Sequence, residues 1–308
     1  MKSLTRRDAV KLIGMTGLAC ISPVSFGLSN FENVMLSRKI PSSGEELPTV
    51  GLGTWIQFDV GKSDSSRDPL RQVLLKMLEK GGELIDSSPM YGTAENVVGD
   101  LTTELKIQDK FFYATKVWTS GKDSGINQMK ASMRKMKRDK MDLMQIHNLV
   151  DWQTHLKTLR DWKERGTIGY LGITHYTDSS HQRLIRIIET EDIDFVQFNY
   201  SIAGRNAEKG LLSAAKDNGV AVIINRPYEG GSLFARTRGK EIPPWAKELD
   251  INSWGQFFLK FILGHEAVNC VIPGTSKPNH LVDNMQAGYG LMPDQPTRDK
   301  MAKYFEEL

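Results

Sequence analysis

The chain has 308 residues, of which 40% are hydrophobic and 25% are charged, close to the averages of soluble globular proteins. This composition excludes a disordered chain, a collagen-like fibre and a membrane protein with many spans. Lys and Arg number 40 and Asp and Glu 37; without the first 27 residues the two counts are equal at 36. Because residues 28–308 carry no net charge, they give no electrostatic basis for binding nucleic acid. The two cysteines, Cys20 and Cys270, exclude a disulfide framework.

The first 27 residues are typical of an export signal. A basic segment, M-K-S-L-T-R-R-D-A-V-K, precedes a mildly apolar stretch that is rich in small residues and too interrupted to form a stable membrane span. Arg6 and Arg7 resemble a twin-arginine motif, although Ala9 and Val10 depart from it. We therefore expect residues 1–27 to be a signal peptide recognised by export machinery, with residues 28–308 released into the periplasm. The alternative is an amphipathic helix on a cytoplasmic protein.

From residue 35 onward, β-rich runs alternate with amphipathic runs of helix length. Most β-rich runs are continuously apolar, as in parallel strands that are covered on both faces. Strands are expected to begin near Thr49, Glu83, Phe111, Met141, Ile168, Asp194, Val220 and Val268, with helices over residues 70–80, 94–105, 126–137, 155–165, 181–190, 208–218, 254–263 and 278–287.

Eight such units predict an α/β fold, a (β/α)8 TIM barrel with an N-terminal β-hairpin and a C-terminal helix. No G-x-G-x-x-G follows the first strand, which argues against a doubly wound dinucleotide-binding sheet. Residues 35–47, with the turn P-S-S-G, predict a hairpin that closes the bottom of the barrel. Residues 229–252 predict an extra loop before the last strand, and such long loops are usually functional.

Four ionisable residues stand at or just after strand ends, where barrels of this type carry their chemistry: Asp86, Tyr91, Lys116 and His147. A tyrosine is a poor acid at neutral pH, but a nearby ammonium stabilises its phenolate. Asp86 would keep Lys116 charged, and His147 would hold a substrate oxygen. This set protonates a carbonyl oxygen, and because no side chain delivers hydride, it implies a nicotinamide cofactor.

The chain resembles the aldo-keto reductase family over residues 35–290. The matching stretches are L-P-T-V-G-L-G-T-W, E-L-I-D-S-S-P-M-Y-G-T-A-E, Y-A-T-K-V-W, M-D-L-M-Q-I-H, F-V-Q-F-N-Y-S and V-I-P-G-T-S-K-P-N-H-L-V-D-N. The resemblance implies reduction of aldehydes or ketones to alcohols with NADPH, or with NADH as the second candidate. It also implies Tyr91 as general acid, and substrate-pocket positions at Trp55 and Trp118.

The same resemblance implies a set of cofactor-binding positions along the strand ends. Gln197 matches the residue that holds the nicotinamide carboxamide, and Asn284 matches one that contacts the adenine. The other expected cofactor-binding residues are Gly53, Thr54, Thr174, His175, Arg226, Gly230, Gly231, Leu233, Gly274, Thr275, Ser276 and His280.

Three segments of the sequence depart from the family pattern. Thr174-His175 stands where Ser-Asn is usual, and both can hydrogen-bond the carboxamide. Asn225-Arg226-Pro227 replaces an aromatic residue followed by Ser-Pro, so the ring that stacks on the nicotinamide is missing unless Tyr228 or another ring replaces it. Gly274 and His280 stand where Lys and Arg usually bind the 2′-phosphate, so we expect only a modest preference for NADPH.

The sequence therefore predicts a monomeric, exported carbonyl reductase that acts on a small-molecule carbonyl substrate. Two alternatives remain open at this point. One is a cofactor-binding sensor or partner subunit with little turnover, which the missing ring favours; the other is a different reaction, such as isomerisation, on the same barrel. The spacing of the histidines and cysteines gives no indication of a metal site.

Overall fold

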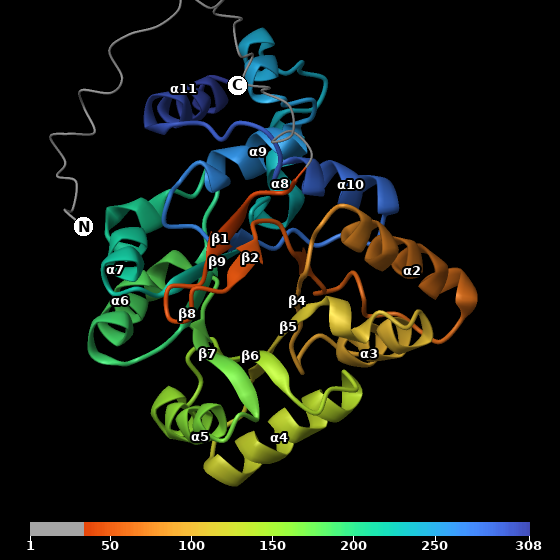
Figure 1. Cartoon of the computed structure of the whole chain (residues 1–308). Coiled ribbons are helices and arrows are strands. Elements are labelled where there is room, and N and C mark those ends of the chain that lie inside the picture. Colours follow the sequence, from red (N-terminus) through yellow and green to blue (C-terminus); the bar gives the residue numbers. More distant parts are fainter. Residues whose placement is uncertain (1–33) are drawn as a thin grey trace, which may run out of the picture. The chain divides into compact units, whose positions relative to one another are not determined.

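The computed structural model describes residues 34–308, which form a closed barrel of parallel strands surrounded by helices (Figure 1). The eight strands follow the order β10-β9-β8-β7-β6-β5-β4-β3. Parallel bridges from Val50 to Val271 and from Gly53 to Gly274 join the first and last of them. The predicted TIM barrel is confirmed. The barrel strands are β3 (Leu52–Gly53), β4 (Leu84–Asp86), β5 (Phe112–Val117), β6 (Met141–His147), β7 (Ile168–Thr174), β8 (Phe195–Asn199), β9 (Ala221–Asn225) and β10 (Cys270–Val271).

The helices between the strands agree closely with the sequence prediction. They are α2 (Asp64–Glu79), α3 (Ala94–Glu104), α4 (Lys122–Lys135), α5 (Trp152–Glu164), α6 (His181–Thr190), α7 (Leu211–Asp217), α9 (Trp254–Leu263) and α10 (Pro278–Gln286), followed by the C-terminal α11 (Gln295–Glu306). The helix α2 begins six residues before the predicted start at residue 70, and Pro69 lies in its second turn.

The predicted N-terminal hairpin is present and closes one end of the barrel. Strands β1 (Ser37–Lys39) and β2 (Glu46–Pro48) pair in antiparallel fashion and lie across the barrel in Figure 1. Ile40 and Leu47 pack into a hydrophobic cluster with inward-facing residues from the starts of the strands, including Phe112, Tyr170 and Phe195. The N-terminal end of the barrel is therefore filled with apolar side chains, which leaves the opposite end for polar chemistry.

The predicted loop 229–252 is largely folded into short helices, η5 (Glu229–Gly231), α8 (Ser232–Arg236) and η6 (Pro244–Leu249). Aromatic rings hold this segment to α9: Phe234 packs on Phe258 with ring centroids 5.7 Å apart, and Trp245 packs on Phe257 at 6.0 Å. Arg236 donates a hydrogen bond to the carbonyl of Phe305 at the end of α11. The long loop is thus a packed element of the domain.

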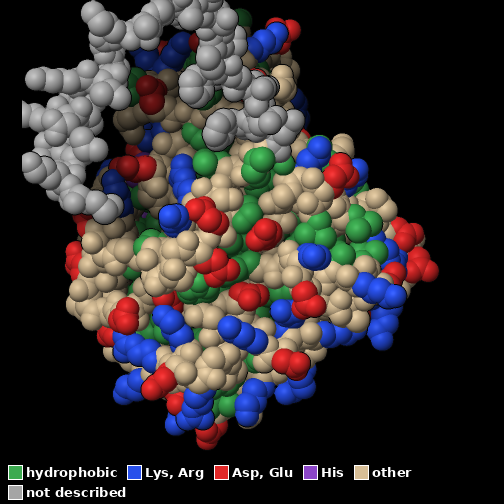
Figure 2. Space-filling view, in the orientation of Figure 1, with side chains coloured by type: hydrophobic (Ala, Val, Ile, Leu, Met, Phe, Trp, Pro, Cys, Tyr) green, Lys and Arg blue, Asp and Glu red, His purple; other side chains and the backbone are tan. Residues whose placement is uncertain are grey.

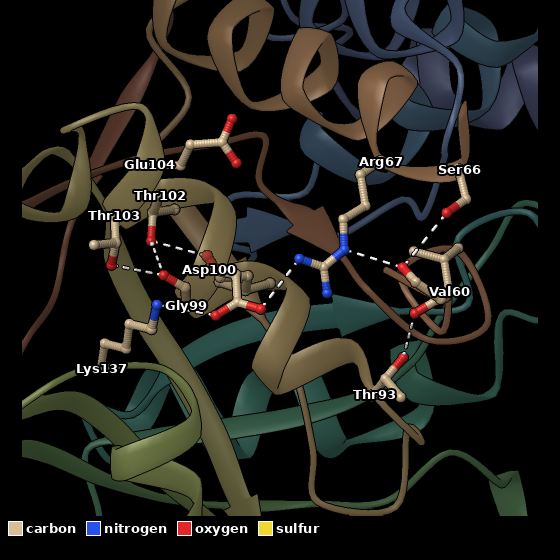
Figure 3. A network of polar contacts seen from close by, with 12 residues as sticks. Val60, Ser66, Arg67, Thr93, Gly99, Asp100, Thr102, Thr103, Glu104 and Lys137 are labelled. Carbon is tan, nitrogen blue, oxygen red and sulfur yellow. Dashed lines mark hydrogen bonds and ion pairs between the residues drawn. The ribbon is translucent and has the colours of Figure 1, made fainter. Parts of the chain in front are cut away.

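A polar network joins α2, α3 and the segment after α4 (Figure 3). Asp100 on α3 pairs with Arg67 on α2 at 3.1 Å and with Lys137, just after α4, at 2.9 Å. Thr93, which precedes α3, donates to Asp59 at 3.0 Å and to the carbonyl of Val60 at 3.0 Å. These contacts tie the loop after β3 to the loop after β4, which carries Tyr91.

The face of the barrel seen in Figure 2 carries Lys and Arg side chains interspersed with Asp and Glu, without a large area of one sign. This mixture agrees with the balanced charge of the sequence after residue 27. Within residues 34–308, none of the helices has the length and apolar character that crossing a bilayer requires.

Gly99 marks a close approach between α3 and the end of α4. A Cβ atom at this position would overlap the carbonyl oxygen of Lys135 and lie 2.8 Å from Cα of Met136. A Gly→Ala change inside a helix ordinarily stabilises it by about 1 kcal/mol. We expect the opposite sign for Gly99→Ala, because both atoms that it meets belong to the backbone and cannot rotate away.

The measurement is the free energy of unfolding in urea. Asn96→Ala, at an exposed position on the same helix, is the matched control and should be neutral or slightly stabilising. A Gly99→Ala variant as stable as the wild type would show that α3 and α4 can separate without loss.

Candidate active site

The four residues expected to carry the chemistry lie at the C-terminal end of the barrel. Asp86 ends β4, Lys116 lies near the end of β5, His147 ends β6, and Tyr91 lies in the loop between β4 and α3. Lys116 is fully buried and Asp86 is 2% exposed. The structure thus brings together the four residues that the sequence singled out, from three adjacent strands and one loop.

The buried ion pair between Lys116 and Asp86 is the centre of the site. The ammonium of Lys116 donates to Oδ2 of Asp86 at 2.5 Å and to the carbonyl of Ser87 at 2.7 Å. Oδ1 of Asp86 accepts from the side-chain amides of Gln145 at 3.1 Å and Gln197 at 2.9 Å. Burial alone would lower the pKa of Lys116, but the charge of Asp86 and the hydrogen bonds outweigh it and raise that pKa.

Tyr91 lies against this ion pair. The Lys116 ammonium is 5.1 Å from the centroid of the Tyr91 ring. Burial raises the pKa of the Tyr91 phenol, the charge of Lys116 lowers it, and the charge of Asp86 raises it again. The expected lowering by Lys116 is present, but the net pKa of Tyr91 lies above its ordinary value because burial is the larger effect. The phenol is therefore protonated over the physiological range and is ready to act as an acid.

His147 is a neutral imidazole beside Tyr91. Burial, together with the charges of Lys116 and His175, lowers the pKa of His147 to about 3. Its Nδ1 lies 2.9 Å from the hydroxyl of Ser88, and that hydroxyl also accepts a weak hydrogen bond from the backbone N–H of Met90 at 3.4 Å. The Ser88 hydroxyl has one hydrogen and two lone pairs, so after it accepts from Met90 it can either donate to Nδ1 or accept from it. When the hydroxyl donates to Nδ1, the ring proton of His147 lies on Nε2. Nε2–H is then a hydrogen-bond donor for a substrate oxygen.

The ends of β7, β8 and β9 carry a second polar group that continues the network. Oε1 of Gln197 accepts from the hydroxyl of Thr174 at 3.2 Å and from the amide of Asn225 at 3.3 Å. Asn225 also donates to the backbone carbonyl of His175 at 3.1 Å. Three strand ends are thereby locked to Asp86, so the residues expected at the nicotinamide and those expected to do proton transfer form one rigid unit.

The aromatic residues around the mouth remain accessible. Trp55 is 49% exposed and Trp118 is 42% exposed, and the Trp118 ring lies 6.3 Å from that of His147. Trp118 therefore stands next to the residue that would hold a carbonyl oxygen, as expected for a substrate-pocket position.

Farther along the mouth, a cavity of about 340 Å³ is lined by residues from the ends of β7, β8 and β9, among them Tyr176, Asn199, Arg226 and Glu229. The guanidinium of the exposed Arg226 lies 5.8 Å from the centroid of the Tyr176 ring. This cavity places a cation beside the strand ends that carry Gln197 and Asn225.

Two glycines shape the segment after this cavity. Gly230 and Gly231 have φ values of 70° and 97°, in the left-handed region that only glycine adopts freely. Leu233 follows them as a buried anchor of α8. The backbone at 230–231 is exposed and carries no side chain, so it suits close approach by a pyrophosphate.

Tyr228 does not supply the missing ring. Its hydroxyl donates to Oδ1 of Asn284 at 2.7 Å, and its ring packs on Phe234 at 4.9 Å. These contacts hold Tyr228 between α8 and α10, while the strand-end position expected for a stacking ring holds the polar Asn225.

The remaining expected cofactor positions lie where β3 and β10 meet. Gly53 and Gly274 form a backbone bridge, and the hydroxyl oxygen of the buried Thr54 lies 3.0 Å from both the carbonyl oxygen of Asp86 and the hydroxyl of Ser87. Thr275 is buried, Ser276 donates to Gln57 at 3.2 Å, and His280 is exposed on α10. Within this group His280 is the exposed titratable side chain at a position expected for the 2′-phosphate.

Sequence reasoning missed Gln145, Ser88 and the role of Asn225. Gln145 lies two residues before His147, so the period of a strand places both on the inner face of the barrel. This alternation could have identified Gln145 as a residue that faces the interior of the barrel, as His147 does. Ser88 offered no such signal, because the contact between its hydroxyl and the ring of His147 joins residues 59 positions apart.

The pKa of His147 has a measurable consequence for stability. An unfolded histidine titrates near pH 6.5 and the folded His147 near pH 3, so between these values the unfolded state binds more protons. The contribution of His147 to the free energy of unfolding is therefore fully present above pH 6.5 and decreases as the pH falls below that value. Between pH 7.5 and 5.0 we expect a loss of roughly 2 kcal/mol from His147.

Urea unfolding of the wild type and of His147→Gln at both pH values isolates this contribution, because the other histidines are common to both proteins. The variant should lose less stability on acidification. Equal losses in the two proteins would mean that His147 is protonated in the folded state.

Comparisons with known proteins show the family to which the chain belongs. Residues 49–296 match the model of the aldo/keto reductase family. Methylglyoxal reductase YeaE of Escherichia coli is 27% identical over 81% of this chain and 89% of its own length, and an NADH-specific methylglyoxal reductase of the same species is 25% identical over 68% and 73%. An aldo/keto reductase of Klebsiella pneumoniae, solved with NADP and acetate, superimposes with a TM-score of 0.72 at 22% identity over 85% of this chain and 93% of its own. The chain belongs to the aldo/keto reductase family.

Proposed function

We propose that this protein reduces aldehydes or ketones to alcohols with a nicotinamide cofactor, NADPH in preference to NADH, and that Tyr91 is the general acid. The observation that carries the proposal is the buried arrangement in which Asp86 holds Lys116, Lys116 lies against Tyr91, and His147 stands beside Tyr91 as a neutral donor. Membership of the aldo/keto reductase family supports the same chemistry.

Each residue of the arrangement has a separate task. Nε2–H of His147 donates a hydrogen bond to the carbonyl oxygen and orients it. The phenol of Tyr91 transfers its proton to that oxygen as the alcohol forms, and the adjacent Lys116 ammonium stabilises the phenolate that remains. The nicotinamide, when bound, supplies hydride to the carbonyl carbon. Asp86 keeps Lys116 charged and in place.

The residues present fit such a cofactor. Asn225 has a buried amide oxygen with no donor among the residues that the structure describes, beside Thr174 and Gln197. The bare backbone at Gly230 and Gly231 suits a pyrophosphate, with Arg226 as a cation nearby. Thr275, Ser276 and His280 would meet the 2′-phosphate. His280 and the two hydroxyls are a weaker set than paired Lys and Arg, so the preference for NADPH over NADH is modest.

The exposed rings of Trp55 and Trp118 offer apolar surface and favour hydrophobic carbonyl substrates. The second candidate function, a cofactor-binding sensor or partner subunit with little turnover, rests on one observation. Asn225 stands where a ring would stack on the nicotinamide. Steady-state rates over a panel of aldehydes and ketones, with NADPH and with NADH, distinguish the two functions.

Tyr91→Phe removes the acidic proton while it keeps the ring that packs against His147. We expect kcat for carbonyl reduction to fall by about 10²–10⁴-fold. The dissociation constant for NADPH, measured by fluorescence titration, should change little. A fall in kcat of less than tenfold would show that another group protonates the substrate.

We also propose that the protein is exported as a folded monomer through a twin-arginine signal in residues 1–27. This segment lies outside the described residues, so the proposal is supported by its sequence alone: the Arg6-Arg7 pair, the short apolar stretch and the small residues near residue 27. A twin-arginine route carries folded proteins, which allows a cofactor to be bound before export.

Replacing Arg6 and Arg7 together by Lys keeps the charge but removes the paired guanidinium groups. We expect the double variant to stay in the cytoplasm with its N-terminus uncleaved, as measured by cell fractionation and mass spectrometry of the intact chain. Undiminished export of the double variant would point to the general secretory route.

A further inference from the structure

Asn225, the last residue of β9, has one end of its side-chain amide fully engaged. Its Nδ2 donates to the backbone carbonyl of His175 at 3.1 Å and to Oε1 of Gln197 at 3.3 Å. A backbone carbonyl is always an acceptor, so the nitrogen of the amide must face it. The two partners use both hydrogens of Nδ2 and fix the orientation of the group.

The other end of this amide is a buried acceptor. Oδ1 of Asn225 is shielded from solvent and has no donor among residues 34–308. Buried polar atoms in proteins nearly always have a partner, so such an atom at a binding site calls for an explanation. Asn225 as a whole is half-buried, and the next residue, Arg226, is exposed and lines the cavity at the mouth.

The amide of Gln197 and the ring of His175 cannot take the place of this acceptor. Oε1 of Gln197 already accepts from Thr174 and Asn225, and its Nε2 donates to Asp86. Nδ1 of His175 accepts from the backbone N–H groups of Tyr176 at 3.0 Å and Thr177 at 3.3 Å, and burial lowers the pKa of His175. A neutral ring with Nδ1 as acceptor carries its proton on Nε2, so His175 offers a donor. Thr174 gives its hydroxyl hydrogen to Gln197 and so already has a partner, whereas Oδ1 of Asn225 is the buried acceptor of this group that has none.

We propose that Oδ1 of Asn225 accepts a hydrogen bond from the carboxamide NH₂ of the nicotinamide, and so positions the ring by a directional contact in place of aromatic stacking. This inference rests on the proposed function, because it requires a nicotinamide cofactor at the mouth of the barrel. It assigns a binding role to a residue whose type, read from sequence, indicated only the loss of a stacking ring.

The contact also connects cofactor binding to the catalytic ion pair. Asn225 is hydrogen-bonded to Gln197, and Gln197 to Asp86. A carboxamide bound by Asn225 therefore has a fixed position relative to the residues that hold Lys116. Asn225 is a positioning residue in this scheme. Its loss should weaken binding of the carboxamide group more than it slows proton transfer from Tyr91.

The test compares two ligands that differ in the donor itself: NADP⁺ and its 3-acetylpyridine analogue, in which a methyl group replaces the NH₂ of the carboxamide. Dissociation constants are measured by calorimetry for the full chain as wild type, Asn225→Ala, Asn225→Ser and Asn199→Ala. Asn199 is the matched control, because it ends the adjacent strand β8 and both ends of its amide have partners, Asp178 at 2.6 Å and His181 at 3.1 Å.

We expect the wild type to bind NADP⁺ about three- to tenfold more tightly than the analogue, the effect of one net hydrogen bond. The ratio should fall to about one in Asn225→Ala, with Asn225→Ser as the replacement that keeps a polar group if the alanine variant does not fold. Asn199→Ala should keep the wild-type ratio.

Equal affinities of the wild type for NADP⁺ and for the analogue would overturn the role of Asn225, and so would an unchanged affinity ratio in the Asn225 variants. In either case, binding of NADP⁺ would leave the proposed function standing. Failure of the wild type to bind either nucleotide, or NADPH, would overturn the proposed function and this inference together.

Discussion

The ion pair between Lys116 and Asp86 is the interaction on which the rest of this site depends. An ammonium and a carboxylate buried to this extent are stable only when they are paired and when their remaining hydrogen-bonding positions are filled. The carbonyl of Ser87 and the amides of Gln145 and Gln197 fill those positions. Breaking such a pair typically costs about 3–5 kcal/mol, so it constrains the four strands that supply it.

The barrel separates stability from chemistry along its axis. At the N-terminal end, the hairpin β1–β2 and a cluster of apolar side chains exclude water and need no polar partners. At the C-terminal end, every strand from β4 to β9 contributes a polar side chain to one connected network. Because the apolar end supplies the packing, the polar end can hold a buried charge, a neutral histidine and an open acceptor without loss of the fold.

In the proposed binding mode, polar residues near the ends of β7, β8 and β9 position the nicotinamide in place of aromatic stacking. A nicotinamide that stacks on an aromatic ring can slide parallel to that ring, whereas a hydrogen bond from its carboxamide to a fixed amide sets its distance and direction from the protein. The side chains of Thr174, Gln197 and Asn225 are held by one another and by Asp86, so their positions are set before a ligand arrives. Preorganisation of this kind lowers the cost of ordering on binding.

The sequence by itself determined the eight βα units, the hairpin, and the four residues Asp86, Tyr91, Lys116 and His147. These follow from local information: apolar runs of strand length, helical periodicity, and the rule that strand ends carry the chemistry of a barrel. The starts of β6 and β7 and the bounds of α6 and α9 were also predicted from the sequence. The first and last strands begin two or three residues later than expected, because their pairing depends on closure of the barrel between residues far apart in the chain.

Only the tertiary structure decided what each polar group does. Tyr91 has a raised rather than a lowered pKa because burial, which no motif reports, outweighs the charge of Lys116. Tyr228 is turned toward Asn284, and Asn225 is left with an open acceptor, because the partners of each amide and hydroxyl come from other strands and helices. Residue type and spacing fix which groups reach the mouth of the barrel, but hydrogen-bond partners and burial are properties of the assembled core.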